Sequence, residues 1–60
     1  MKWNELKRIA ERYGWYLIKN GKKHDIYAHP EYPYRIEIAR HWKEEIPNGT
    51  FSKLKKQIGF

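Results

Sequence analysis

Residues 15–39 read WYLIKNGKKHDIYAHPEYPYRIEIA, and this stretch decides the fold. It contains three short runs rich in β-branched and aromatic residues, at 15–19, 24–29 and 34–39. Asn20-Gly21 follows the first run and favours a tight hairpin turn, because both residues tolerate positive φ. Pro30 ends the second run. Strands this close together along the chain predict a three-stranded antiparallel meander.

An amphipathic helix is predicted on each side of the meander. Before it, one apolar face recurs at helical spacing: Leu6, Ile9, Ala10 and Tyr13. Asn4 is the expected N-cap of this helix, and Gly14 stands where a left-handed C-terminal cap is expected. After the meander, Thr50 is the expected N-cap of a helix whose buried stripe is Phe51, Leu54 and Ile58.

The elements follow the order α-β-β-β-α, so the predicted fold class is α+β, in one domain over residues 1–60. Each helix has a single apolar stripe, so both helices are expected on one face of the three-stranded antiparallel sheet. Ile36 and Ile38 are expected to face them, with Arg35 and Glu37 on the other side. Trp15 and Tyr13 are assigned to the core. This is the layout of double-stranded-RNA-binding domains, which read the shape of the RNA minor groove.

The net charge and the composition indicate which kinds of partner the protein can bind. Thirteen Lys and Arg against seven Asp and Glu give a formal net charge of +6, which attracts polyanions, with nucleic acid as the first candidate. No apolar run approaches the roughly 20 residues that span a membrane, and no signal peptide is recognisable. Cysteine is absent, which excludes a disulfide framework and thiolate zinc sites. We therefore expect a cytoplasmic protein with no membrane partner.

His24 is the candidate for chemistry, because it stands at the head of the second strand directly after Lys22 and Lys23. Taken alone, a histidine near a turn is more often a surface residue that bonds a neighbour. Asp25 alternates to the other face of a regular strand and is not an obvious partner for the ring. His29 is expected to pair across the sheet or cap a strand end. No ligand spacing is recognisable, so we predict no metal site and no cofactor.

The chain resembles the HicA toxins of bacterial and archaeal toxin–antitoxin pairs, which are small ribonucleases on a double-stranded-RNA-binding-like fold. Four pieces carry the resemblance, in order and at the family's spacing: WNELKRIAERYGWYLIK, KKHDIYAHP, PYRIEIARH and PNGTFSKLKKQIG. In that family a glycine–serine–histidine motif opens the second strand and its histidine is catalytic. His24 occupies that position here, while Lys22 and Lys23 stand where the two small residues usually are.

The resemblance implies a metal-independent endoribonuclease that cleaves mRNA and is neutralised by a HicB antitoxin. His24 would then transfer a proton as general acid or base, with Lys22, Lys23 or both holding the phosphate. The other predicted RNA contacts are Arg40, His41, Lys43, Lys53 and Lys56. The alternative for each of them is an ordinary solvated surface residue without a ligand. A non-catalytic RNA-binding module and an inactive partner of a repressor remain open as alternative functions.

Two aromatic residues leave two interpretations open. Tyr27 is either a core residue or a platform on which a base stacks. Trp42 either folds back over one end of the sheet or stands exposed as an interface anchor. Because the resemblance implies an antitoxin that masks the active site, His24, Tyr27 and Trp42 are the predicted antitoxin contacts.

Overall fold

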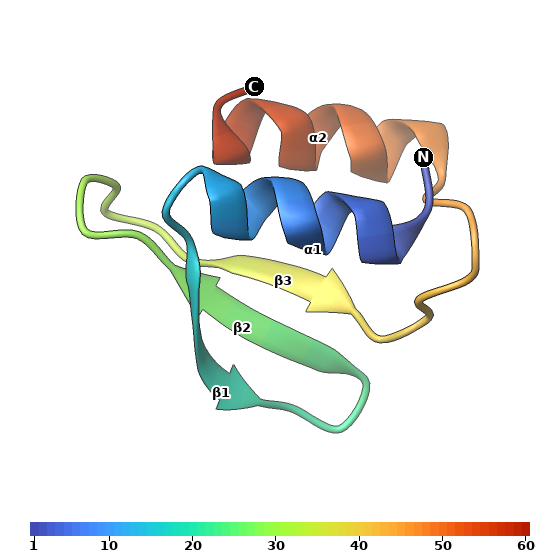
Figure 1. Ribbon diagram of the computed structural model, residues 1–60, viewed down its shortest axis with the longest axis horizontal. Helices are drawn as coiled ribbons and strands as arrows, with labels where there is room; N and C mark the ends of the chain where they lie inside the picture. The colour runs from blue at the N-terminus through green and yellow to red at the C-terminus, as the bar shows by residue number, and fades with distance from the viewer.

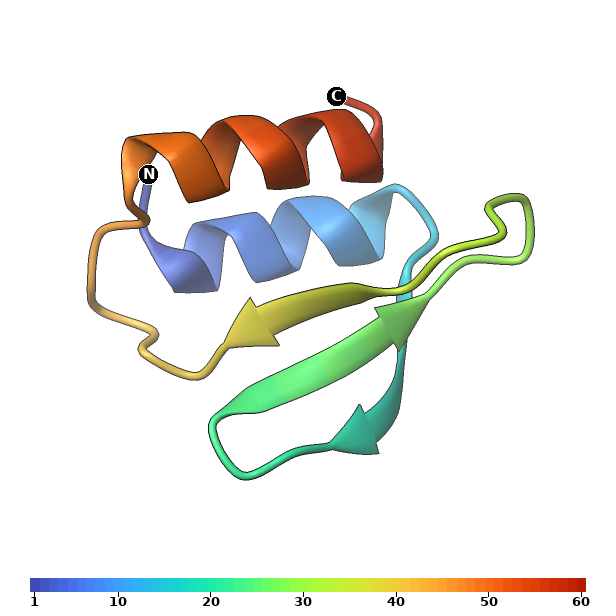
Figure 2. The ribbon, with the colours of Figure 1, turned by 180° about the vertical axis from the view of Figure 1, so that it is seen from behind.

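The computed structural model describes residues 1–60 as two layers, a sheet and a pair of helices (Figure 1). The elements are α1 (Trp3–Arg12), β1 (Tyr16–Asn20), β2 (His24–Ala28), β3 (Ile36–Ala39) and α2 (Asn48–Ile58). The strands form one antiparallel sheet in the order β1-β2-β3. Both helices lie on the same face of the sheet, side by side and running in the same direction (Figures 1 and 2). The predicted α-β-β-β-α fold, of the double-stranded-RNA-binding type, is confirmed.

The core lies between the two layers. Eleven buried residues form one apolar cluster, to which both helices and the strands β2 and β3 contribute: Trp3, Leu6, Ala10, Trp15, Tyr27, Ile36, Ile38, Ala39, Ile46, Leu54 and Ile58. The predicted inward direction of Ile36 and Ile38 is confirmed, as is the burial of Trp15. The core assignment of Tyr13 is wrong, because the side chain is 49% exposed. Tyr13 is the C-cap residue and lies beyond the last helical residue, so its side chain does not continue the buried face of the helix.

Both helices begin earlier than their expected caps. α1 starts at Trp3 instead of after Asn4, because carbonyls of the loop before α2 accept the N–H groups of its first turn: Trp3 N donates to Glu44 O and Asn4 N to Trp42 O, each at 3.2 Å. α2 starts at Asn48 and has Pro47 as its N-cap instead of Thr50. The cap of α1 by distant backbone is invisible to a local sequence pattern. Neither helix has the length and apolar character needed to cross a membrane.

The end of α1 follows the prediction. Gly14 has φ +98°, the left-handed conformation expected there. Trp15 N donates to Ala10 O at 3.0 Å and Gly14 N donates to Glu11 O at 3.1 Å, which together make a Schellman motif. This cap directs Trp15 into the core at the start of the sheet.

The β1–β2 connection differs from the predicted two-residue turn. Neither Asn20 nor Gly21 has positive φ, and residues 21–23 form the connection. Gly21 N donates to His24 O at 2.9 Å. Glycine is needed because a Cβ at this position would overlap the carbonyl oxygen of His24, so the requirement is close approach and not a left-handed backbone. This connection carries Lys22 and Lys23 and delivers His24 to the start of β2.

Candidate active site

His24 projects from the sheet face that the helices leave open. Along β2, Asp25 and Tyr27 are buried whereas His24 is exposed, so the imidazole lies on the face opposite to those two side chains. Its cross-strand partner is Ala39 of β3, a residue with little bulk. The prediction that Asp25 points away from the His24 ring agrees with this alternation. Because the ring is exposed on an open face, a large ligand such as a polynucleotide can reach it.

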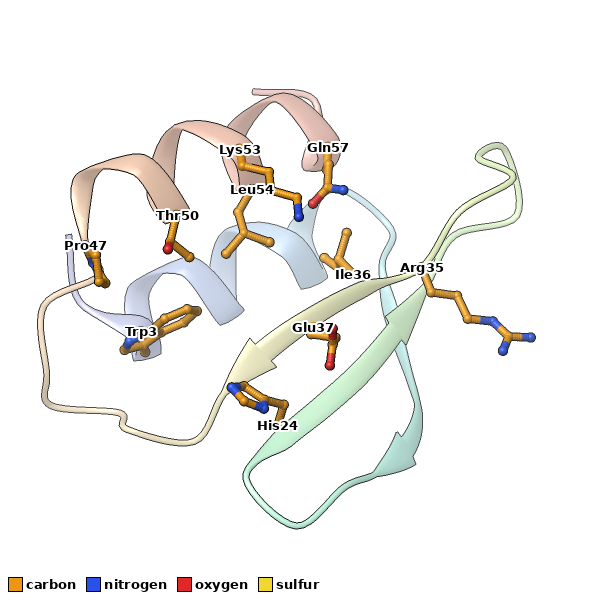
Figure 3. Close-up of a pocket in the computed structure, with 10 residues that line it drawn as sticks. All are labelled: Trp3, His24, Arg35, Ile36, Glu37, Pro47, Thr50, Lys53, Leu54 and Gln57. Carbon is orange, nitrogen blue, oxygen red and sulfur yellow. The ribbon is translucent and has the colours of Figure 1, made fainter.

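Two shallow hollows meet at His24. The first, of about 340 Å³, runs along the edge of β3 beside α2 (Figure 3). Lys53 of α2 lines it together with His24 and Glu37, and the remaining lining residues are Trp3, Arg35, Ile36, Pro47, Thr50, Leu54 and Gln57. The predicted RNA contact Lys53 thus shares a groove with the candidate catalytic residue.

The second hollow lies over the β1–β2 hairpin on the open face of the sheet. It has a volume of about 400 Å³, and its lining includes three lysines, Lys19, Lys22 and Lys23, beside His24 and Glu37. The structure therefore brings Lys22, Lys23 and Lys53 to His24 from two sides. Cations on both sides of a site favour a bridging anion such as a phosphodiester.

The turn that carries Lys22 and Lys23 is held from the end of β3. The guanidinium of Arg40 donates to the carbonyls of Gly21 and Lys22, and its Nε lies 3.5 Å from Oδ1 of Asp25. Asp25 is only 6% exposed, so this ion pair compensates a buried carboxylate. Arg40 was predicted to bind RNA. Its guanidinium makes these contacts within the protein while the residue stays exposed, and the RNA contact stays a prediction.

Tyr27 belongs to the core. Its side chain is 1% exposed beneath the helices, so it presents no surface on which a base could stack or an antitoxin could dock. The predicted antitoxin contact of Tyr27 is therefore corrected, because strand alternation puts it on the face opposite to His24. Burial, and to a smaller degree the negative charges of Glu11 and Asp25, raise the pKa of its hydroxyl.

His29 ties the end of β2 to the end of α1. Its Nε2 lies 2.8 Å from Tyr13 O, and its Nδ1 accepts from Glu31 N at 3.0 Å. A ring whose Nδ1 accepts must carry its proton on Nε2, so Nε2 donates to Tyr13 O. The ring also packs against Trp15, with 5.2 Å between centroids. His29 thus caps the strand end, one of the two roles expected for it.

The other predicted contacts lie outside both hollows. His41 Nδ1 is 3.4 Å from Glu44 Oε2, and Lys43 and Lys56 are exposed elsewhere on the surface. Trp42 is half-buried and folds back against the core, with Lys7 Nζ of α1 5.9 Å from the centre of its ring. Contacts of these four residues with RNA or antitoxin stay predictions. No group of three or more carboxylates and imidazoles is placed to hold a metal ion.

Glu37 is a residue of the site that the sequence reasoning did not single out. It lines both hollows, and alternation had correctly put it on the open face of the sheet. The missing information was the register between β2 and β3, which pairs Ile26 with Glu37 and so brings Glu37 near His24. Sequence alternation gives the face but not the register of strands joined by a seven-residue loop.

These observations define a class of protein: a small α-β-β-β-α domain of the double-stranded-RNA-binding type, with an exposed histidine between two hollows, one lined by three lysines and the other by Lys53. A family model described as the HicA toxin of bacterial toxin–antitoxin systems matches residues 3–60. The chain therefore belongs to the HicA toxin family, whose members are generally ribonuclease toxins, and it is the toxin of a toxin–antitoxin system with an antitoxin partner. A search of curated proteins found no match.

Proposed function

We propose that this toxin is a metal-independent endoribonuclease that cleaves mRNA in the cytoplasm, with His24 as its general acid or base. One observation carries the proposal. The exposed His24 imidazole stands where two hollows meet, with Lys22 and Lys23 on one side and Lys53 on the other. Membership of the HicA family supports RNA as the substrate.

RNA cleavage of this kind needs few protein groups, because the 2′-OH of the RNA is itself the nucleophile. A base takes the proton of the 2′-OH, the oxygen attacks the adjacent phosphorus, and an acid protonates the departing 5′ oxygen. An imidazole suits either proton transfer, since both of its protonation states are available near neutral pH. Lysine ammonium groups around the phosphate would stabilise the negative charge that builds up as the bond forms. The open, shallow site fits a long polymer that lies across the surface.

The test compares wild-type protein with His24→Ala on a labelled mRNA fragment in the presence of EDTA. We expect the variant to lose a factor of about 10² to 10⁴ in cleavage rate, the usual contribution of one positioned acid or base. The His24 side chain is exposed and makes no hydrogen bond or ion pair within the protein. Removing it should therefore leave the thermal melting point and the binding of RNA close to wild type.

Ser52→Ala, on the exposed side of α2 and outside both hollows, serves as the control that should keep full activity. Undiminished cleavage by His24→Ala would remove this residue from the mechanism. RNA binding without any cleavage by the wild-type protein would instead favour the non-catalytic RNA-binding module.

We further propose that the antitoxin is a HicB protein that covers His24. A masked imidazole is the simplest means of neutralising a site this open. Beside the hairpin, β1 exposes Tyr16, Leu17 and Ile18, and these apolar side chains support a protein contact at that edge of the sheet. Titration with HicB should protect RNA from the wild-type toxin. Leu17→Asp should weaken that protection and leave cleavage by the free toxin unchanged.

A further inference from the structure

Glu37 and His24 are neighbours on the same face of the sheet. The β2–β3 register pairs Ile26 with Glu37 and His24 with Ala39, so Glu37 and His24 are diagonal neighbours on the open face of the sheet. The Cβ atoms of such a pair lie about 7–8 Å apart or somewhat less. They are the two residues that line both hollows, and Figure 3 shows them beside each other on neighbouring strands.

The carboxylate of Glu37 is unpaired although lysines line the same hollows. Of the seven Asp and Glu residues, five have a side-chain hydrogen bond or ion pair, and Glu31 and Glu37 have neither. Glu37 is the one acidic residue that lines either hollow. In a surface that serves only to hold phosphate, a carboxylate repels the ligand. A role in proton transfer accounts for its presence.

We propose that Glu37 is a second catalytic residue, the general base that takes the 2′-OH proton while His24 is the general acid. The inference rests on the ribonuclease activity proposed above. Attack in line places the 2′ oxygen and the leaving 5′ oxygen on opposite sides of phosphorus. One proton-transfer group is therefore needed on each side. Two side chains on the diagonal of neighbouring strands, several ångströms apart, are arranged to straddle a phosphate in this way.

The proposed reaction is a transesterification at phosphorus. The Glu37 carboxylate accepts the proton from the 2′-OH, the 2′ oxygen forms its bond to phosphorus, and the bond from phosphorus to the 5′ oxygen breaks. The leaving oxygen takes a proton from the His24 imidazolium. The products are a 2′,3′-cyclic phosphate and a 5′-hydroxyl, and no water is consumed. Exchange with solvent returns Glu37 to the carboxylate and His24 to the imidazolium.

The first experiment replaces the base with an isosteric amide. Glu37→Gln should lower the cleavage rate by about 10² to 10⁴, while Glu37→Asp keeps part of the activity. RNA binding by Glu37→Gln should be unchanged or tighter, because the substitution removes a negative charge from a cationic surface. Glu31→Gln makes the same chemical change at the other unpaired carboxylate, outside both hollows, and should cleave like wild type.

The second experiment assigns the two roles with an RNA that has sulfur in place of the bridging 5′ oxygen. A thiolate leaves without a proton, so this substrate needs a base but no acid. His24→Ala should recover most of the wild-type rate on it, whereas Glu37→Gln should stay impaired. The reverse pattern, rescue of Glu37→Gln alone, would overturn the assignment of base and acid.

The outcomes separate this inference from the proposed function. Wild-type cleavage rates in Glu37→Gln, with His24→Ala inactive, would overturn the role of Glu37 and leave the ribonuclease proposal standing. Absence of cleavage by the wild-type toxin would overturn both. Loss of activity with lost RNA binding or a lowered melting point in Glu37→Gln would make Glu37 structural and would also overturn the inference.

Discussion

At the scale of the residue, three histidines of identical chemistry have three different environments. His29 uses both ring nitrogens in hydrogen bonds that join β2 to α1. His41 stands beside Glu44 in a loop. The side chain of His24 makes no hydrogen bond or ion pair within the protein and stands at the meeting point of two hollows. Availability for proton transfer, and not residue type, sets His24 apart.

Buried Tyr27 should make the free energy of unfolding depend on pH in the alkaline range. Burial, with smaller effects of Glu11 and Asp25, raises the pKa of its hydroxyl above the ordinary value of 10.0. The folded state therefore holds this proton more tightly than the unfolded state. Its contribution to stability is fully present below about pH 10 and is lost as pH rises through the folded-state pKa. The free energy of unfolding should then fall by up to about 1.4 kcal/mol per pH unit.

Urea unfolding of wild type and Tyr27→Phe, at steps from about pH 9 to about pH 11.5, measures this effect as the difference in slope. Tyr27→Phe should show the shallower decline. Tyr16→Phe, with an exposed ring on β1, is the matched control and should follow wild type. Equal slopes in all three proteins would contradict the prediction.

At the scale of the element, the β1–β2 hairpin that carries the candidate residue His24 depends on the end of β3. The turn between β1 and β2 has no left-handed residue to lock its shape. Arg40 instead holds the carbonyls of Gly21 and Lys22 and pairs with buried Asp25. The lysines beside His24 are thus placed by a side chain that follows β3, sixteen residues further along the chain than His24.

Arg40→Gln should destabilise the fold by about 1–3 kcal/mol, because it leaves the Asp25 carboxylate buried without a counter-charge. Adding Asp25→Asn should recover part of that loss, since the uncompensated charge is then absent. Chemical denaturation of the two single variants and the double variant measures the coupling. Arg8→Gln, at an exposed position of α1, is the control. Simple additivity of the two substitutions would argue against the clamp.

At the scale of the whole molecule, the formal charge of +6 is distributed unevenly with respect to the site. Lys19, Lys22, Lys23 and Lys53 line the hollows around His24, whereas Lys56 lies outside them. Non-specific attraction depends on the total charge. Contact with a docked phosphate depends on which cations the fold has gathered.

Binding of a non-cleaved single-stranded RNA should therefore weaken as salt rises. Each phosphate contact removed should reduce the slope of log Kobs against log salt by about 0.7. We expect Lys53→Gln to give such a reduction and Lys56→Gln a smaller one, measured by fluorescence anisotropy with the His24→Ala background to prevent cleavage. A larger effect for Lys56 would mean that the RNA crosses the outer face of α2 instead of the groove.

Much of the architecture could be predicted from local pattern. Alternation gave the correct inward face of β3, and Gly14 and the spacing of Leu6 and Ala10 gave the end and the buried side of α1. Predictions failed where residues far away along the chain supply the contact. The start of α1 is capped by the loop at 42–44, and the β1–β2 turn is held by Arg40.

The amino-acid sequence by itself determined the order of elements, the cationic character, the family and the identity of the candidate histidine. These follow from short-range periodicity, from summed charge and from motifs read along the chain. Only the tertiary structure decided that Tyr27 is buried, that Arg40 serves the turn, and that Lys53 and Glu37 stand beside His24. Strand register and helix packing depend on contacts between segments far apart in the chain, and a local pattern contains no information about those distances.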